Sequence, residues 1–388
     1  MQTCFLHSAD WQLGKPFASL DDDAKRHRLQ QERVHVIQRM AKIVEETAPS
    51  FVVVAGDVFD SPHVTKSIVS TACAAIGSLK VPVIVIPGNH DHAGPGSIWE
   101  QAFFLREQRE LAPNLRVLLK PEPLVLDSAV IFPAPLLRRH ETGNTTAWIR
   151  QAVIDPSLPE DLPRVIVAHG TIQGFGSTQL DEDGSPALIN WIDLSSLPLE
   201  AIDYIALGDW HGTKQVGHKA WYSGTPEMDR FAKGDSNDPG NILKVIISRG
   251  QPPQVEKIPS GRFVWKEHFF RFTDDASLDA LASQLEKLIG QRGDEHLIHL
   301  TLEGSLGIAA SDHLEKIIES WDSRLIRLSL DNRVTIAPTE EEIIALTCRM
   351  DDPLIASVAT ELVDRSQADT EEAAIARIAL RELHAALA

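Results

Sequence analysis

Five short polar motifs, each placed directly after an apolar run, constrain the fold of this chain more than any other feature. The motifs are ADWQLG (9–14), AGDVFD (55–60), PGNHDH (87–92), VAHG (167–170) and LGDWHG (207–212). Short apolar runs bounded by glycine and polar residues are typical of buried strands. Ligands of open α/β sheets bind outside the carboxyl ends of the strands. We therefore expect the five motifs to bring their polar side chains to one point.

The segments between the first three motifs are predicted to be helical. Residues 24–48 carry apolar side chains at helical spacing, namely Leu29, Val34, Ile37, Met40 and Val44. Residues 65–79 have a similar pattern. Strands that alternate with helices form βαβ units, which makes the strands parallel with right-handed crossovers. The Pro/Gly-rich stretch 249–262 keeps an apolar alternation, and we expect a hairpin there at the edge of the first domain.

The pattern of predicted helices and strands changes after residue 262. The stretch FVWKEHFFRF (263–272) is followed by a capped helix (274–291), a strand (296–304), a helix (311–321) and a strand (324–332). This βαβαβ pattern predicts a small α+β domain over residues 263–338. Residues 339–388 are predicted to be wholly helical. We thus expect three parts, with boundaries at 262 and 338.

Charge and composition indicate which binding partners and which cellular compartment suit this chain. The formal net charge is -18, and residues 271–388 carry 11 Lys and Arg against 23 Asp and Glu, a net of -12. Such an acidic part is a poor binder of DNA phosphates by itself. No run approaches the roughly 18–20 apolar residues of a membrane span, and the first residues do not resemble a signal peptide. Three widely spaced cysteines favour free thiols in a reducing compartment, so we expect a cytoplasmic protein without a membrane partner.

The polar residues of the motifs are of the types that bind divalent metals. Carboxylate and amide oxygens suit harder ions, and imidazole suits Mn, Fe, Zn or Co. Most of the motifs are weak evidence alone, since an Asp after a strand is more often a helix cap or a turn residue. GNHD (88–91) is a stronger signal, because it combines an amide, an imidazole and an acid in one tight turn that begins with glycine. The order of all five motifs, each at a predicted strand end, is strong evidence for a metal site.

These motifs resemble those of the calcineurin-like metallophosphoesterases, and among them the SbcD-type nuclease subunits of bacterial double-strand-break repair. The stretches that carry the resemblance are LHSADWQLGKPF, VVVAGDVFDSP, VIVIPGNHDH, VAHG, YIALGDWHG and WYSGTPE, within roughly residues 1–250. The resemblance implies an α/β fold, a four-layer αββα sandwich with a smaller C-terminal α+β capping domain. Residues 1–262 would be the catalytic domain, 263–338 the capping domain and 339–388 a C-terminal helical segment.

The same resemblance implies a phosphodiesterase with two metal ions, which clamp the phosphate and activate water for in-line attack. The residues at the metal-binding positions are Asp10, Gln12 and His211 for the first ion, Asp57 as the bridge, and Asn89, His169 and Asp209 for the second. His90 matches the catalytic histidine beside the scissile phosphate, and we expect Asp91 to orient His90 by a hydrogen bond.

Two positions depart from the pattern of the family, which has histidines where this chain has Gln12 and Asp209. Both changes replace an imidazole nitrogen by an oxygen, which favours harder ions. We expect the site to bind two divalent ions. Mn²⁺ is the expected ion, Mg²⁺ is the alternative, and both are favoured over Zn²⁺. The neutral amide of Gln12 would bind more weakly than imidazole, so the first site could also empty easily.

The leading functional hypothesis is a metal-dependent DNA exo/endonuclease that processes double-strand breaks or DNA ends. Its expected partners are DNA, an SbcC-like coiled-coil ATPase and a second copy of the chain, with the helix after Asp23 as a candidate dimer surface. One alternative is a phosphoesterase that acts on small or cyclic nucleotides. Another is a non-catalytic scaffold for the ATPase, which the departures at Gln12 and Asp209 keep open.

Overall fold

The structure is a computed structural model that describes residues 1–172, 189–231, 237–290, 293–368 and 370–387. The chain divides into two compact units, Met1–Arg262 and Phe263–Ala388. Each unit has its own β-structure and core, so each is described by itself.

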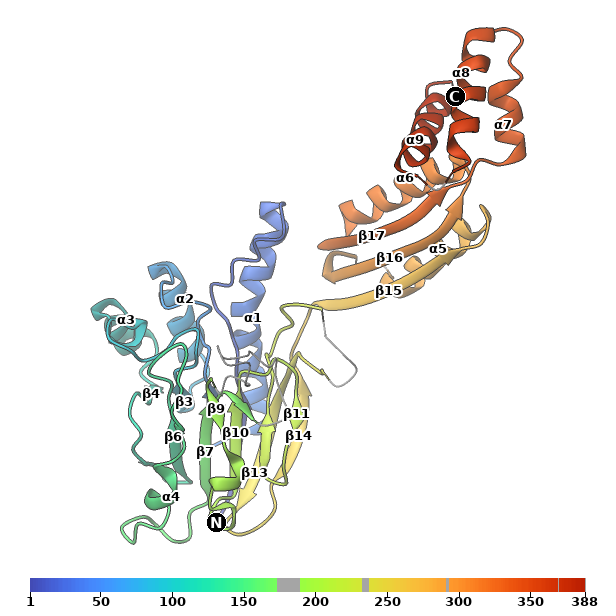
Figure 1. Cartoon of the computed structure of the whole chain (residues 1–388). Helices are drawn as coiled ribbons and strands as arrows, with labels where there is room; N and C mark the ends of the chain where they lie inside the picture. Colours follow the sequence, from blue (N-terminus) through green and yellow to red (C-terminus); the bar gives the residue numbers. More distant parts are fainter. Residues whose placement is uncertain (173–188, 232–236, 291–292, 369, 388) are drawn as a thin grey trace. The chain divides into compact units, whose positions relative to one another are not determined.

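The first unit contains two six-stranded sheets (Figure 1). The first sheet has the strand order β14-β13-β1-β2-β3-β4. Its strands are β1 (Gln2–Ser8), β2 (Val52–Ala55), β3 (Val83–Ile86), β4 (Leu115–Val117), β13 (Asn241–Ser248) and β14 (Gln254–Pro259). Strands β1 to β4 are parallel, as the βαβ pattern predicted. Strands β13 and β14 form the expected antiparallel hairpin, which lies at the edge of the sheet.

The second sheet has the strand order β11-β12-β10-β7-β6-β5. Its strands are β5 (Leu124–Val125), β6 (Val130–Ala134), β7 (Arg164–His169), β10 (Tyr204–Gly208), β11 (Lys214–Gln215) and β12 (Ala220–Tyr222). A separate pair of short strands consists of β8 (Thr171–Ile172) and β9 (Trp191–Ile192). Because β6, β7 and β10 are parallel, their carboxyl ends lie on one edge of the sheet.

The two sheets pack face to face and are covered by helices. Phe5, Val53 and Ile84 of the first sheet pack with Val167 and Ala206 of the second. The helices of this unit are α1 (Asp23–Thr47), α2 (Lys66–Gly77), α3 (Ala102–Leu111) and α4 (Ile149–Ala152), with short 3-10 turns at Ile98–Glu100, Leu194–Ser196 and Leu199–Ala201. Helices α1 to α3 bury their apolar sides against the first sheet, and α4 packs with the outer face of the second. The predicted four-layer αββα sandwich is confirmed.

Helix α1 buries a charged residue that the apolar pattern does not predict. Asp22 caps the helix, and its carboxylate accepts hydrogen bonds from the backbone of Ala24 and Lys25. Arg33 is fully buried, whereas the neighbouring Val34, which the periodicity placed on the apolar stripe, is only partly buried. The buried side of α1 is therefore rotated towards the loops that follow the strands.

The second unit has the predicted βαβαβ order, followed by three helices. Its strands β15 (Val264–Phe272), β16 (His296–Leu306) and β17 (Arg327–Ile336) form a parallel sheet. Its helices are α5 (Ser277–Ile289), α6 (Ile308–Arg324), α7 (Glu340–Thr347), α8 (Pro353–Ser366) and α9 (Glu371–Ala385), with a 3-10 turn at Gly293–Glu295. Leu281 and Leu285 of α5 pack with Ile298, Leu300 and Leu302 of β16 in one core.

No helix within the described ranges has both the length and the apolar character that crossing a membrane requires.

Candidate metal centre

All five motifs lie at the carboxyl ends of strands of the first unit, where parallel strands present their loops. Asp10 and Gln12 follow β1, Asp57 follows β2, and Asn89 with His90 follows β3. In the second sheet, His169 is the last residue of β7, and Asp209 and His211 follow β10. Both sheets therefore contribute side chains to one region, as the strand-end pattern predicted.

The backbone holds four of these residues in an uncommon conformation. Asp10, Gln12, Asp57 and Asp209 have φ angles of 54°, 49°, 55° and 101°. Positive φ is uncommon for residues other than glycine, and such strain concentrates at functional sites. Backbone hydrogen bonds maintain the conformation, because Gln12 N donates to Asp57 O at 2.9 Å and Asp10 N donates to Gly56 O at 3.1 Å.

Two glycines allow the loops to approach each other closely. A Cβ at Gly56 would lie 2.3 Å from Nδ1 of His169, and a Cβ at Gly88 would lie 2.1 Å from Oδ1 of Asp57. Both positions would clash with a predicted metal ligand if they carried a side chain. The absence of a side chain at Gly56 and Gly88 therefore allows His169 and Asp57 to occupy their positions in the site.

Four of the predicted ligands converge around one imidazole nitrogen. Nε2 of His169 lies 3.0 Å from Oδ1 of Asn89, 3.6 Å from Oδ2 of Asp57 and 3.8 Å from Oδ1 of Asp209. Nδ1 of His169 donates a hydrogen bond to the Ala55 carbonyl at 2.8 Å, which leaves Nε2 to bind a metal. This nitrogen and its three oxygens belong to the residues that the family resemblance assigned to the second ion, with Asp57 as the bridge.

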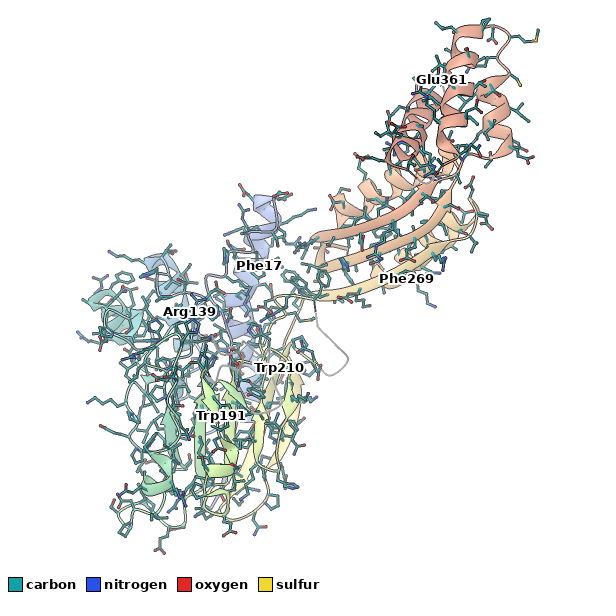
Figure 2. The ribbon with its side chains drawn as sticks, viewed as in Figure 1. Phe17, Arg139, Trp191, Trp210, Phe269 and Glu361 are labelled. Atoms are coloured by element: carbon teal, nitrogen blue, oxygen red, sulfur yellow. The ribbon has the colours of Figure 1, made fainter. Side chains whose placement is uncertain are left out.

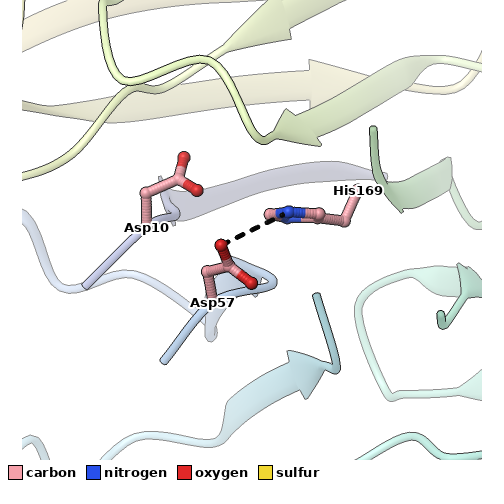
Figure 3. A group of neighbouring side chains, drawn as sticks. All are labelled: Asp10, Asp57 and His169. Carbon is pink, nitrogen blue, oxygen red and sulfur yellow. Dashed lines mark ion pairs between the residues drawn. The ribbon is translucent and has the colours of Figure 1, made fainter. Parts of the chain in front are cut away.

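A smaller group of atoms links the two expected metal positions. Asp10, Asp57 and His169 each offer a ligand atom within 4.8 Å of the others, and all three side chains are buried (Figure 3). Burial raises the pKa of Asp10 and of Asp57. Burial alone would lower the pKa of His169, but the carboxylates of Asp57, Asp10 and Asp209 raise it to about 9. Buried carboxylates around one imidazole are a suitable site for a divalent cation, which would displace that proton.

The residues assigned to the first ion lie in the same region, and Gln12 and Asp10 form hydrogen bonds with the neighbouring site residues Asp57 and Asp209. Nε2 of Gln12 donates to Oδ2 of Asp57 at 3.1 Å. Both carboxylate oxygens of Asp10 accept from the Asp209 backbone N–H at 3.2 Å. His211 acts electrostatically on Asp10, since its charge lowers the pKa of that carboxyl against the effect of burial.

Asp229 is a site residue that the sequence analysis missed. Its Oδ1 lies 3.0 Å from Nδ1 of His211, and its Oδ2 lies 2.9 Å from Nζ of Lys15. Burial would raise the pKa of Asp229, but His211, Arg33 and Lys15 hold it well below the usual range. A carboxylate on Nδ1 leaves Nε2 of His211 available for a metal, which is the common arrangement of metal-binding histidines. Lys15 directly follows the first motif, but Asp229 has no local sequence signal.

The expected hydrogen bond between Asp91 and His90 is replaced by another arrangement. Asp91 is buried, and its carboxylate accepts from the backbone N–H of Gly88 at 2.7 Å and of Phe59 at 3.1 Å. The ring of His90 is oriented by the Asp60 carbonyl, which lies 2.8 Å from its Nδ1. The expectation that Asp91 orients His90 was wrong, because the tight turn after β3 aims the carboxylate at the backbone. Asp91 shapes the loop, and Asp60 holds the ring.

Arg33 is a second residue that the sequence did not reveal. Its guanidinium donates to the backbone carbonyls of Trp11 at 2.8 Å and Asp10 at 2.9 Å, and to Oγ1 of Thr225 at 2.9 Å. It also donates to the carbonyl of Glu227. Arg33 thus fastens the loop that carries Asp10 and Gln12 to helix α1 and to the segment after β12.

Fold and donor set together define an α/β protein with a candidate divalent-metal centre at the carboxyl ends of its strands. The family model described as calcineurin-like phosphoesterase matches residues 5–250, which is more than half of the chain. The chain belongs to the calcineurin-like phosphoesterase family, whose members are metal-dependent phosphoesterases. The crystal structure of TT1561 of Thermus thermophilus aligns with 67% of this chain and 100% of its own, at 11% identity and a TM-score of 0.39.

Proposed function

We propose that the protein is a metal-dependent DNA exo/endonuclease that acts in double-strand-break or DNA-end processing in the cytoplasm. The observation that carries the proposal is the set of oxygens around Nε2 of His169, next to the loop of His90. The likeness to SbcD-type subunits in the first and last motifs supports DNA as the substrate. We further propose Mn²⁺, or else Mg²⁺, as the ion, because oxygen ligands predominate.

The residues present fit a divalent metal centre. Asp57, Asn89, His169 and Asp209 would hold one ion, and Asp10, Gln12, Asp57 and His211 the other. Bound ions of this kind supply positive charge against the phosphate and make water a better nucleophile.

His90 would act at the leaving oxygen. Because the Asp60 carbonyl occupies Nδ1, the other ring nitrogen is left to exchange a proton with the oxygen that departs from the phosphate. The Asp57 carboxylate also accepts from the backbone N–H of His90 at 2.9 Å. The position of the catalytic histidine is therefore tied to the carboxylate that would bridge the two ions.

A basic loop beside the His90 loop supports a polyanionic substrate. Arg138, Arg139 and His140 are exposed, and Figure 2 labels Arg139. Their loop is hydrogen-bonded to the turn after β3, through Ala93 N to Leu136 O at 2.8 Å. Exposed arginines at this place could position a DNA backbone in a chain that is otherwise strongly acidic.

The second unit offers apolar surface for the proposed ATPase. Ile344, Leu354, Ile375 and Ile378 of α7, α8 and α9 are 60%, 74%, 61% and 51% exposed. Large exposed apolar side chains on helices are typical of docking sites for another helix. We propose that these helices bind the coiled coil of an SbcC-like ATPase, and that a homodimer, if formed, uses α1.

A nuclease assay with two substrates tests the proposal. We expect Mn²⁺-dependent cleavage of linear and hairpin DNA and of bis(p-nitrophenyl) phosphate, with His90→Ala reducing both rates about 10²–10⁴-fold. Arg138→Glu and Arg139→Glu should reduce DNA cleavage only, since their proposed role is to position the DNA backbone, which the small substrate lacks.

Arg150→Glu is the matched control for the charge reversals. Arg150 is exposed on α4, and that helix lies near the start of β7, where the Val153 carbonyl accepts from Arg164, away from the His169 end. Hydrolysis of the small substrate without DNA cleavage would favour a small-molecule phosphoesterase. Inertness towards both substrates, together with unchanged biological activity of His90→Ala, would favour a scaffold.

A further inference from the structure

Lys15 places a fixed positive charge inside the region of the first metal position. The residue follows the first motif by one position, and only 24% of its side chain is exposed. Its Nζ lies 2.9 Å from Oδ2 of Asp229, 3.4 Å from Oε1 of Gln12 and 3.7 Å from Oδ1 of Asp60. Two carboxylates therefore hold the ammonium group against the amide oxygen of Gln12.

The amide of Gln12 is occupied at both ends. Its nitrogen donates to Asp57 and its oxygen accepts from Lys15. The opposite orientation would set the amide nitrogen against an ammonium group and the amide oxygen against a carboxylate, so the neighbours determine which way the amide points. Yet the amide oxygen is the only atom with which Gln12 could bind a divalent ion.

The second metal position has no such competitor among the contacts described for it. Nε2 of His169 faces oxygens of Asn89, Asp57 and Asp209. The contacts described for this nitrogen are all with oxygen atoms, and no ammonium group is among them. At the first position the ion must instead take an oxygen from an ammonium group that two carboxylates hold in place.

We propose that Lys15 is a built-in competitor for the first metal position: it holds the Gln12 amide oxygen, so that the chain keeps one divalent ion tightly at His169 and a second one only weakly. This inference rests on the proposed metal centre and specifies how its two positions differ. It makes Lys15 a residue that sets metal occupancy by way of Gln12, without contact to the substrate.

Metal counting and titration test the inference without an activity assay. After dialysis against metal-free buffer, the wild type loaded with Mn²⁺ should retain one ion per chain by mass spectrometry. Calorimetric titration should then show a second, weaker site. Lys15→Met should raise the affinity of that weaker site about tenfold or more, because a positive charge beside a ligand oxygen is removed.

Three further variants make the outcome decisive. Lys42→Met removes the same charge from an exposed position of α1 (80% of its side chain is accessible) and should leave both sites unchanged. Lys15→Gln serves where Lys15→Met folds poorly. In a Gln12→His background, Lys15→Met should change the affinity much less, because the amide through which Lys15 acts is gone.

Each remaining result overturns a distinct claim. Two ions held equally tightly by the wild type, or an unchanged weaker site in both Lys15 variants, would refute the competition. An equal effect of Lys15→Met in both backgrounds would refute the route through Gln12. A protein that binds no Mn²⁺ in any variant would instead refute the metal-dependent function itself.

Discussion

Replacing Asp229 by asparagine tests whether the buried carboxylate controls His211. The substitution keeps the shape of the side chain but removes the charge that lies 3.0 Å from Nδ1 of His211 and 2.9 Å from Nζ of Lys15. An asparagine can also turn its amide nitrogen towards the ring, which would favour the wrong tautomer. Outer partners of metal-binding histidines typically contribute 10–100-fold to metal affinity, and we expect the weaker Mn²⁺ site of Asp229→Asn to lose about that much.

The same substitution should lower the free energy of unfolding. Breaking a buried ion pair costs about 3–5 kcal/mol, and because asparagine retains hydrogen bonding we expect about 1–3 kcal/mol at pH 7. The pKa of Asp229 is depressed in the folded protein, so the stability that its charge contributes is present above about pH 4 and is lost as the pH falls through the folded pKa. The difference between the two proteins should therefore shrink below pH 4.

Urea unfolding and Mn²⁺ calorimetry measure both effects. Glu256→Gln is the control, since it removes the same charge from a surface pair with Lys244 in which Glu256 is 64% exposed, and it should cost less than about 1 kcal/mol. If Asp229→Asn kept the wild-type affinity and stability within the error of that control, Asp229 would not support His211.

Two other predictions concern the framework of the site. Arg33→Met should reduce the free energy of unfolding by about 3–5 kcal/mol, since it leaves buried carbonyls of Asp10 and Trp11 without their donor. Arg33→Lys should recover part of that loss in urea titrations, and equal values for both variants and the wild type would contradict the role of Arg33. Burial lowers the pKa of His7 to about 3, so the unfolded chain binds the extra proton between about pH 6.5 and 3 and stability falls as the pH is lowered. His7→Gln should therefore gain about 1.4 kcal/mol per pH unit relative to the wild type between pH 6 and 4; a pH-independent difference would show that His7 does not carry this effect.

The fold and most of the predicted donor positions follow from short-range patterns. Strands β2 and β3 are apolar runs followed by a glycine-containing polar turn, and those local signals suffice to place Asp57 or Asn89 at a strand end. Helix spacing between the strands gives parallel pairing, and the alternation around residue 254 gives the hairpin of β13 and β14. What the sequence predicts well is therefore the set of elements and the edge of the sheet at which the site lies.

The partners of the site residues could not be predicted, because they connect distant parts of the chain. Arg33 reaches Thr225 across 192 positions, and Asp229 pairs with Lys15 although the two residues lie near opposite ends of the first unit. The helical pattern of α1 even favoured Val34, since a buried arginine satisfied by carbonyls leaves no apolar signal. Asp91 was misjudged for a related reason: adjacency to His90 suggested contact, whereas the turn directs its carboxylate to Gly88 and Phe59.

The convergence of loops from both sheets has a mechanical consequence. Asp10, Asp57 and Asn89 extend from the first sheet, and His169 and Asp209 extend from the second. A metal ion bound among these residues would therefore link the two sheets of the sandwich at that edge. Its binding energy would then resist separation of the layers at that edge. Removal of the metal with a chelator should increase amide hydrogen exchange first at the carboxyl ends of β2 and β7, where the Ala55 carbonyl contacts the His169 ring.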